Sequence, residues 1–157
     1  MDDQQLLAII RQHQPMLYKI CRLYRDTRED REDLFQEIVY QVWKAYPAYR
    51  AEAKVSSWIY RIALNTALAA FRKRAPPVIY RDSLPEQAAD PEDARQELQE
   101  QLFAALKQLS DADRALMALY LEDLSYQEIA AITGIAENYV GVKLHRIRNR
   151  IKTLLKL

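Results

Sequence analysis

The sequence predicts an all-α protein in which two small helical domains are joined by a flexible linker. Only two glycines occur among the 157 residues, and apolar residues recur at i, i+3 and i+4 along most of the chain, as on the buried face of a helix. This periodicity stops at residues 76–91, which contain four prolines. We therefore expect an N-terminal bundle of three or four helices at residues 1–75, a linker at 76–92 and a C-terminal helix-turn-helix bundle at 93–157.

The first half has the apolar spacing of three long helices. Residues 4–24 form the first, in which Pro15 either kinks the helix or begins a second one. Residues 30–46 form the next, with acidic side chains in its first turn. The third covers residues 56–74, and either of the two serines at its start can cap it. The inward-facing stripes of these helices include both tryptophans, Trp43 and Trp58.

The linker separates two regions of different charge. Residues 76–106 carry seven acidic side chains against two basic ones, whereas the segments on both sides have more basic than acidic residues. The adjacent prolines Pro76 and Pro77 favour an extended backbone. We expect this segment to hold the two halves apart, so that they act on separate sites.

The second half contains the signals of a helix-turn-helix. Ser125 and Glu128 have the spacing of a capping box, which starts a helix. Gly134 follows as a turn residue, and Val140 and Leu144 can pin the next helix against the first. The helices are expected at about residues 98–109, 112–121, 126–132 and 137–156.

The outward face of the last helix is rich in amides and cations. Such side chains can reach base edges or phosphates in the major groove of DNA. A solvated basic face on an amphipathic helix is the alternative, and the basic run alone does not exclude it. Together with the capping box and the turn glycine it favours a DNA-binding helix, with these candidate contacts: Asn138, Lys143, His145, Arg146, Asn149 and Arg150.

Several classes of function are disfavoured by the composition. The single cysteine, Cys21, lies in an apolar helical pattern typical of core packing and cannot form an internal disulfide. Neither histidine has a second ligand at metal-binding spacing, and two glycines cannot build a phosphate-binding loop. We expect no metal, no cofactor and no small-molecule substrate, and no enzymatic activity. An acidic amino terminus and the lack of a long apolar run predict a cytoplasmic protein.

Three segments resemble the extracytoplasmic-function (ECF) sigma factors of the sigma-70 family. Residues 121–130 and 146–148 are similar to the region of these proteins that reads the minus-35 promoter element. The segment Asp33-Leu34-Phe35-Gln36-Glu37, followed by Trp43-Lys44-Ala45, resembles their polymerase-binding helix. Residues 58–65 resemble their minus-10 helix. The resemblance covers both halves in the family's order and implies a sigma factor that directs core RNA polymerase to specific promoters.

The resemblance also implies partners and roles. Core RNA polymerase and promoter DNA would be the partners, and an anti-sigma factor is common in this family. The polymerase would bind Asp33, Leu34, Gln36 and Glu37. These acids also suit a helix start without any partner, because they favour the helix dipole. The minus-10 strand would contact Arg50, Lys54, Ser56, Ser57, Arg61, Asn65, Arg72 and Lys73, whereas Trp58 is assigned to packing.

The chain differs from many members of the family at the start of its last helix. Gly141 and Val142 stand where arginine or serine is common, and Ala136 cannot cap by its side chain. The base preference therefore cannot be copied from relatives. A ligand-binding or dimeric helix-turn-helix regulator is the leading alternative function. A helical hydrolase that uses Asp26, Glu29, Asp30 and Asp33 would need inward-facing metal ligands.

Overall fold

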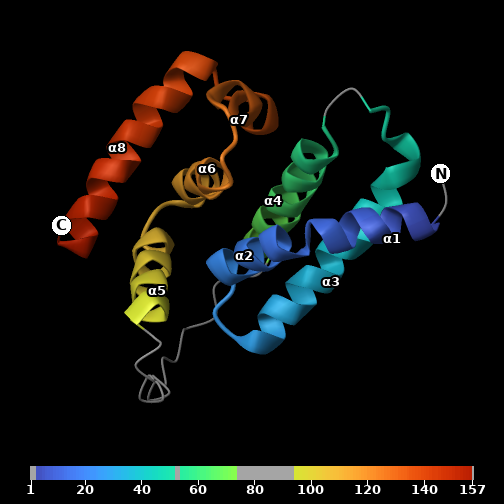
Figure 1. Cartoon of the computed structure of the whole chain (residues 1–157), viewed down its shortest axis with the longest axis horizontal. Helices are drawn as coiled ribbons and strands as arrows, with labels where there is room; N and C mark the ends of the chain where they lie inside the picture. Colours follow the sequence, from blue (N-terminus) through green and yellow to red (C-terminus); the bar gives the residue numbers. More distant parts are fainter. Residues whose placement is uncertain (1–2, 52–53, 74–93, 157) are drawn as a thin grey trace.

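The computed structural model describes residues 3–51, 54–73 and 94–156, and no strand occurs in them. The chain is all-α, as predicted (Figure 1). The predicted linker, residues 76–92, lies wholly outside the described residues. The elements are α1 (Asp3–Gln12), α2 (Gln14–Tyr24), α3 (Arg28–Ala45), the 3-10 helix η1 (Tyr46–Ala48), α4 (Val55–Lys73), α5 (Ala94–Lys107), α6 (Asp111–Leu121), α7 (Tyr126–Thr133) and α8 (Glu137–Leu155).

The helix starts follow local chemistry. Pro15 begins a second helix rather than kinking one, because a proline in the first turn of α2 needs no amide partner. Helix α3 starts two residues before the predicted position, since the Thr27 hydroxyl accepts a hydrogen bond from Asp30 N at 3.1 Å. The serine cap predicted for α4 is wrong. Both serines lie inside that helix, and the carbonyl of Lys54 accepts the first hydrogen bond, from Trp58 N at 3.0 Å.

Helices α2, α3 and α4 form the core of the first half. Leu17, Ile38 and Ile59 have no exposed surface and supply one side chain from each helix. The packing role predicted for Trp58 is confirmed, because its ring lies 4.7 Å from that of Tyr49 and against the core. Trp43, by contrast, was predicted to face inward and is 54% exposed. It follows Val42, which occupies the buried position.

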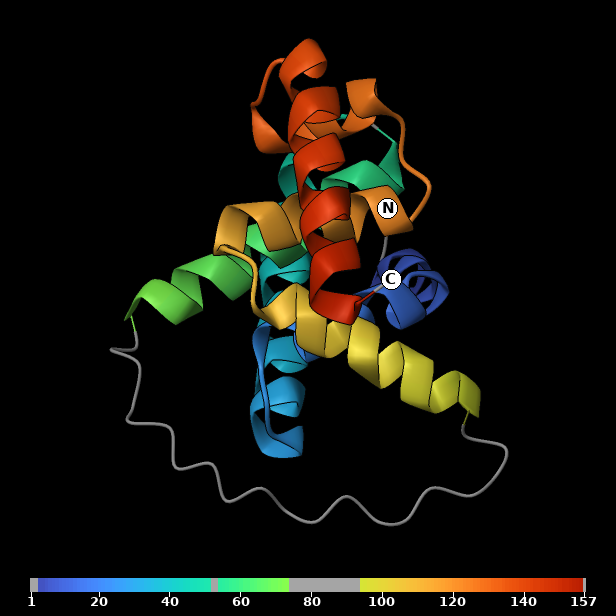
Figure 2. The ribbon, with the colours of Figure 1, turned by 90° about the vertical axis from the view of Figure 1, so that its left-hand side faces the viewer.

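Helices α5 to α8 form the core of the second half. The side chains of Leu116, Ile129 and Leu144 are fully buried there, from α6, α7 and α8 respectively. Helix α8 packs against α5, α6 and α7. In Figure 2 it runs along the face of the molecule nearest the viewer, in front of the other helices. This position leaves one long side of α8 open to solvent.

The two halves contact each other in the structure. Helix α7 packs on α4, and α5 packs on α2. Glu122, just after α6, accepts hydrogen bonds from Lys19 Nζ at 3.1 Å and from the Tyr60 hydroxyl at 3.4 Å. The Tyr24 hydroxyl donates to the backbone oxygen of Asp111 at 3.1 Å. Buried apolar residues of both halves join in one continuous core, so the expected separation of the halves is not what the structure shows.

Burial raises the pKa of several side chains in this shared core, among them Cys21 and Tyr60. It raises the pKa of the Cys21 thiol to about 11, since a thiolate there would be desolvated. It also raises the pKa of the Tyr60 hydroxyl, with a further contribution from the neighbouring Glu122 carboxylate. Both groups are neutral at physiological pH. The packing role predicted for Cys21 agrees with its 1% exposure.

Candidate nucleic-acid interface

Helices α7 and α8 and the turn between them have the geometry of a helix-turn-helix. The predicted capping box is confirmed: Ser125 Oγ accepts from Glu128 N, and a Glu128 carboxylate oxygen accepts from Ser125 N, both at 3.1 Å. Gly134 ends α7 with φ of 79°, a left-handed conformation that glycine adopts without strain. Val140, fully buried, holds the start of α8 against α7. The second helix is thereby fixed with one face outward.

The capping glutamate also connects the two halves of the molecule. Its carboxylate lies 3.4 Å from Nζ of Lys54, a predicted minus-10 contact. The hydrogen bond from the Ser125 amide, helped by the Ser125 hydroxyl and the charge of Lys54, lowers the pKa of Glu128. The folded chain therefore favours the ionised form of Glu128.

This shift predicts a pH-dependent part of the stability. Since the pKa of Glu128 is lower in the folded than in the unfolded chain, its contribution is present above the ordinary glutamate pKa and is lost as pH falls through the folded pKa. Between about pH 5 and pH 3, the free energy of unfolding of Glu128→Gln should therefore fall less than that of the wild type. Urea denaturation at a series of pH values measures this effect. Parallel curves for the variant and the wild type would contradict it.

Helix α8 separates buried and exposed side chains cleanly. Val140, Leu144, Ile147 and Ile151 are buried against α5, α6 and α7. Most of the predicted DNA contacts lie on the opposite, exposed side, where His145 Nε2 is 3.3 Å from Asn149 Nδ2. The exposed members of the predicted set are Asn138, His145, Arg146, Asn149 and Arg150.

Lys143 differs from the rest of the predicted set. Its Nζ lies 3.6 Å from a carboxylate oxygen of Asp113 on α6 and 5.6 Å from the centre of the Tyr139 ring. Its side chain is only 28% exposed. The structure therefore places Lys143 at the edge of the face, in contacts within the second half. Tyr139 and Val142 are also exposed on α8, at 46% and 47%, and lie outside the predicted set of contacts.

The predicted minus-10 residues lie on α4 and the segment before it. Arg61 and Asn65 are exposed, and they are four residues apart, so they share one face of the helix. Arg50 and Lys54 are also exposed, near the start of α4. Ser56 and Ser57 are half-buried. Arg72 and Lys73 belong to the last turn of α4, and their side chains lie outside what the structure describes.

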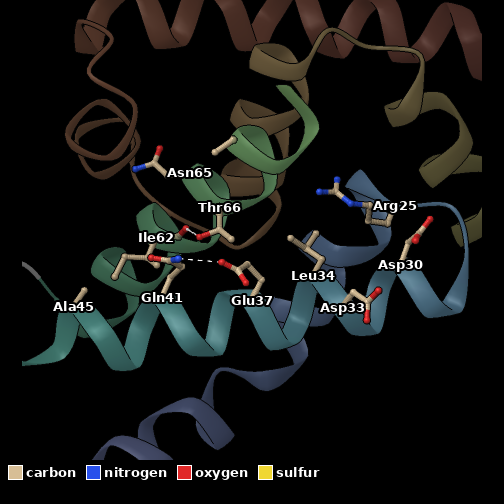
Figure 3. Close-up of a pocket in the computed structure, with 11 residues that line it drawn as sticks. Arg25, Asp30, Asp33, Leu34, Glu37, Gln41, Ala45, Ile62, Asn65 and Thr66 are labelled. Atoms are coloured by element: carbon tan, nitrogen blue, oxygen red, sulfur yellow. Dashed lines mark hydrogen bonds between the residues drawn. The ribbon is translucent and has the colours of Figure 1, made fainter. Parts of the chain in front are cut away.

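A groove of about 690 Å³ runs between α3 and α4 (Figure 3). It brings two predicted sites together, since Asp33 and Glu37 of α3 line it along with Asn65 of α4. Glu37 accepts a hydrogen bond from Gln41 Nε2 at 3.0 Å. The other side chains that line the groove are Arg25, Asp30, Leu34, Gln41, Ala45, Ile62, Thr66 and Ala69.

The predicted polymerase-binding residues do not form one patch. Leu34 is 3% exposed and belongs to the core beneath the groove. Gln36 faces away from the groove, toward a second, apolar groove between α1 and α3. Sequence reasoning missed this second groove, because it assigned Trp43 to the inward-facing stripe of this helix. Its apolar lining is Leu6, Leu7, Ile10, Phe35, Val39, Tyr40 and Trp43.

Comparison with known proteins assigns these elements to a family. Residues 9–76 match the model of Sigma-70 region 2, and residues 99–151 match Sigma-70, region 4. The ECF RNA polymerase sigma factor SigM of Mycobacterium tuberculosis is 31% identical over 150 residues, which cover 94% of this chain and 75% of SigM. The chain belongs to the ECF sigma factors. The identification from sequence motifs is confirmed.

Other relatives and solved structures agree with this assignment. SigE of Mycolicibacterium smegmatis is 32% identical to this sigma factor over 158 residues, covering 94% of the chain and 60% of SigE. The structure of CnrH in complex with the cytosolic domain of CnrY matches with a TM-score of 0.74 at 20% identity, covering 99% and 90% of the two chains. RpoE of Bartonella quintana, in complex with the anti-sigma factor NepR, matches with 0.72 at 24%, covering 98% and 96%. These two structures support the fold.

No helix in the described parts of the chain has the length and apolar character that a membrane crossing requires. Within the same residues, no three His, Cys, Asp or Glu side chains gather as metal ligands would.

Proposed function

We propose that this sigma factor directs core RNA polymerase to particular promoters and catalyses no reaction itself. The first half would bind the polymerase and the minus-10 element, and the second half the minus-35 element. The observation that carries this is the pair of matches to regions 2 and 4 on the two halves, together with the exposed polar face of α8. Action on DNA and polymerase implies a cytoplasmic protein that needs no cofactor and no small-molecule substrate.

The minus-35 contacts would come from the outward face of α8. Arginine and asparagine on such a face can pair with guanine and adenine edges, and cations at its edges can bind phosphates. Arg146 and Asn149 are placed for this on the exposed side, with Asn138 at the first turn. Lys143 would reach a phosphate only by leaving Asp113.

The groove between α3 and α4 would receive both the polymerase and the melted strand. Arg61 and Asn65 offer a cation and an amide on the exposed face of α4. Asp33 and Glu37 offer carboxylates from α3 to basic groups of the polymerase. A strand held by α4 would therefore lie beside the polymerase contact.

An anti-sigma factor is a further proposed partner. RpoE of Bartonella quintana, whose fold this chain shares, was solved with such a protein. Because the halves lie against each other, one such partner could contact region 2 and region 4 together. Sedimentation with candidate anti-sigma proteins encoded next to this chain's gene would test the partnership.

Co-elution with sigma-free core polymerase, followed by run-off transcription from a promoter library, tests the function directly. Wild type should co-elute and give transcripts from a subset of promoters. Glu37→Gln should weaken co-elution, whereas Glu32→Gln is a matched control, because that exposed carboxylate pairs with Arg28 on the same helix. A chain that stays apart from polymerase, and instead binds duplex DNA tightly as a dimer, would favour a helix-turn-helix repressor.

Arg146→Ala should weaken binding to the minus-35 element by about 1–3 kcal/mol, since it removes a donor from the outward face of α8. Arg148→Ala is the matched control. It removes the same charge from the same helix, but the Arg148 guanidinium lies 5.6 Å from the centre of the Tyr120 ring. Fluorescence anisotropy of holoenzyme on labelled promoter DNA measures both variants. Equal losses would mean that charge alone, and not position, determines the affinity.

A further inference from the structure

Val142 occupies a position on α8 that the fold does not explain. It lies four residues after Asn138 and seven before Asn149, so the three side chains share the outward face of the helix. It is 47% exposed and is not part of the apolar core of the described residues. A β-branched residue also lowers helix propensity compared with the lysine or arginine usual on a helix surface. Neither packing nor propensity accounts for valine here.

The residue before Val142, Gly141, lets another side chain approach the backbone of α8 closely. Gly141 has no side chain, and a Cβ there would come within 3.2 Å of Cε2 of Tyr126. Tyr126, from the start of α7, therefore lies directly on the backbone of α8. The shallow hollow that results is lined by Tyr126, Glu137, Asn138 and Gly141. The first turns of α8 thus have a low surface beside the face that Asn138 and Val142 share.

The major groove of DNA offers one apolar group, the C5-methyl of thymine. The isopropyl side chain of valine makes no hydrogen bonds. Among the groups that the major groove presents, the thymine methyl is the one with which it can make a favourable apolar contact. Asn138, on the same face, can pair with the N6 and N7 positions of adenine. Arg146 lies four residues after Val142 and can reach a neighbouring base edge or phosphate.

On the basis of the proposed function, we propose that Val142 is a specificity-determining residue that reads a thymine methyl group in the minus-35 element. The element recognised by this chain therefore contains an A·T pair opposite the first turns of α8. Relatives with a polar residue at this position would lack the contact.

Replacement of thymine by deoxyuridine tests this, since it removes only the methyl group. Holoenzyme is assembled from the full chain and core polymerase, and the strongest promoter from the library is remade with each minus-35 thymine, on either strand, replaced singly. For wild type, one position should lower affinity about three- to tenfold, as expected for one apolar methyl contact. For Val142→Ala the same replacement should have no effect, whereas Val142→Thr, which keeps one methyl, should stay sensitive.

The outcome distinguishes a failure of the proposed function from a failure of the role proposed for Val142. If wild-type holoenzyme gives no transcript from any promoter, the proposed function fails. If it transcribes but tolerates every uracil, or its minus-35 element contains no thymine, the role of Val142 is overturned. It is likewise overturned if Val142→Ala keeps the full uracil effect. Alanine is a better helix former than valine, so this variant should keep the fold.

Discussion

Arg114→Ala should lower the free energy of unfolding by about 2–3 kcal/mol, because it leaves several partly buried carbonyl groups without a donor. The guanidinium of Arg114, on α6, reaches carbonyl groups in and just after the last turn of α5, where a helix leaves most carbonyl groups without an intrahelical donor. It also crosses to the first half of the molecule and lies 5.2 Å from the centre of the Tyr24 ring. The accepting oxygens belong to Leu106 at 3.2 Å, Lys107 at 2.7 Å, Leu109 at 3.2 Å and Leu23 at 2.9 Å.

Urea denaturation measures this loss. Arg114→Lys keeps the charge but cannot place several N–H groups in one plane, so we expect an intermediate value. Arg28→Ala is a suitable control, because its exposed side chain pairs with Glu32 at i,i+4, an interaction worth about 0.3–0.5 kcal/mol. If Arg114→Ala is as stable as Arg28→Ala, the carbonyl groups must find other donors and the assigned role is wrong.

Leu144→Ala should destabilise the chain by about 2–5 kcal/mol, the range for a fully buried leucine that leaves a cavity. Leu144 lies on the inner face of α8, so its loss should also loosen the helix that carries the proposed minus-35 contacts. The next residue provides the control, since His145 is exposed and His145→Ala should change stability by less than about 0.5 kcal/mol. Thermal unfolding followed by circular dichroism distinguishes the two. Similar melting temperatures would mean that α8 contributes little to the core.

Much of the fold could be predicted because its signals are local. The capping box at Ser125 needs only two residues three positions apart, and Gly134 ends α7 through its own backbone freedom. The buried positions of α8 follow from helical periodicity within one segment. The exposed face of the same helix follows from the same period, which is why most of the predicted DNA contacts do lie there.

The features that the sequence did not reveal involve partners that are distant in sequence. Lys143 stays a predicted DNA contact, but Asp113, thirty residues earlier, lies beside it. Trp43 was placed by helix position and Gln36 by the family resemblance, whereas the location of α1 decides which side of α3 becomes an apolar groove. The packing of the halves depends on pairs such as Lys107 Nζ and Asp26, 2.8 Å apart, that no local pattern reveals.

The ion pair between Lys54 and Glu128 bears on how a promoter would be engaged. Two elements centred about 25 base pairs apart, at 3.4 Å a step, span about 85 Å of duplex, whereas here Lys54 of one half and Glu128 of the other lie 3.4 Å apart. For Lys54 to neutralise a phosphate of the minus-10 strand, the contact predicted for it, it must first give up this carboxylate. Phosphate binding by Lys54 then exchanges one anion for another. The free energy gained is smaller than for a lysine that has no carboxylate partner.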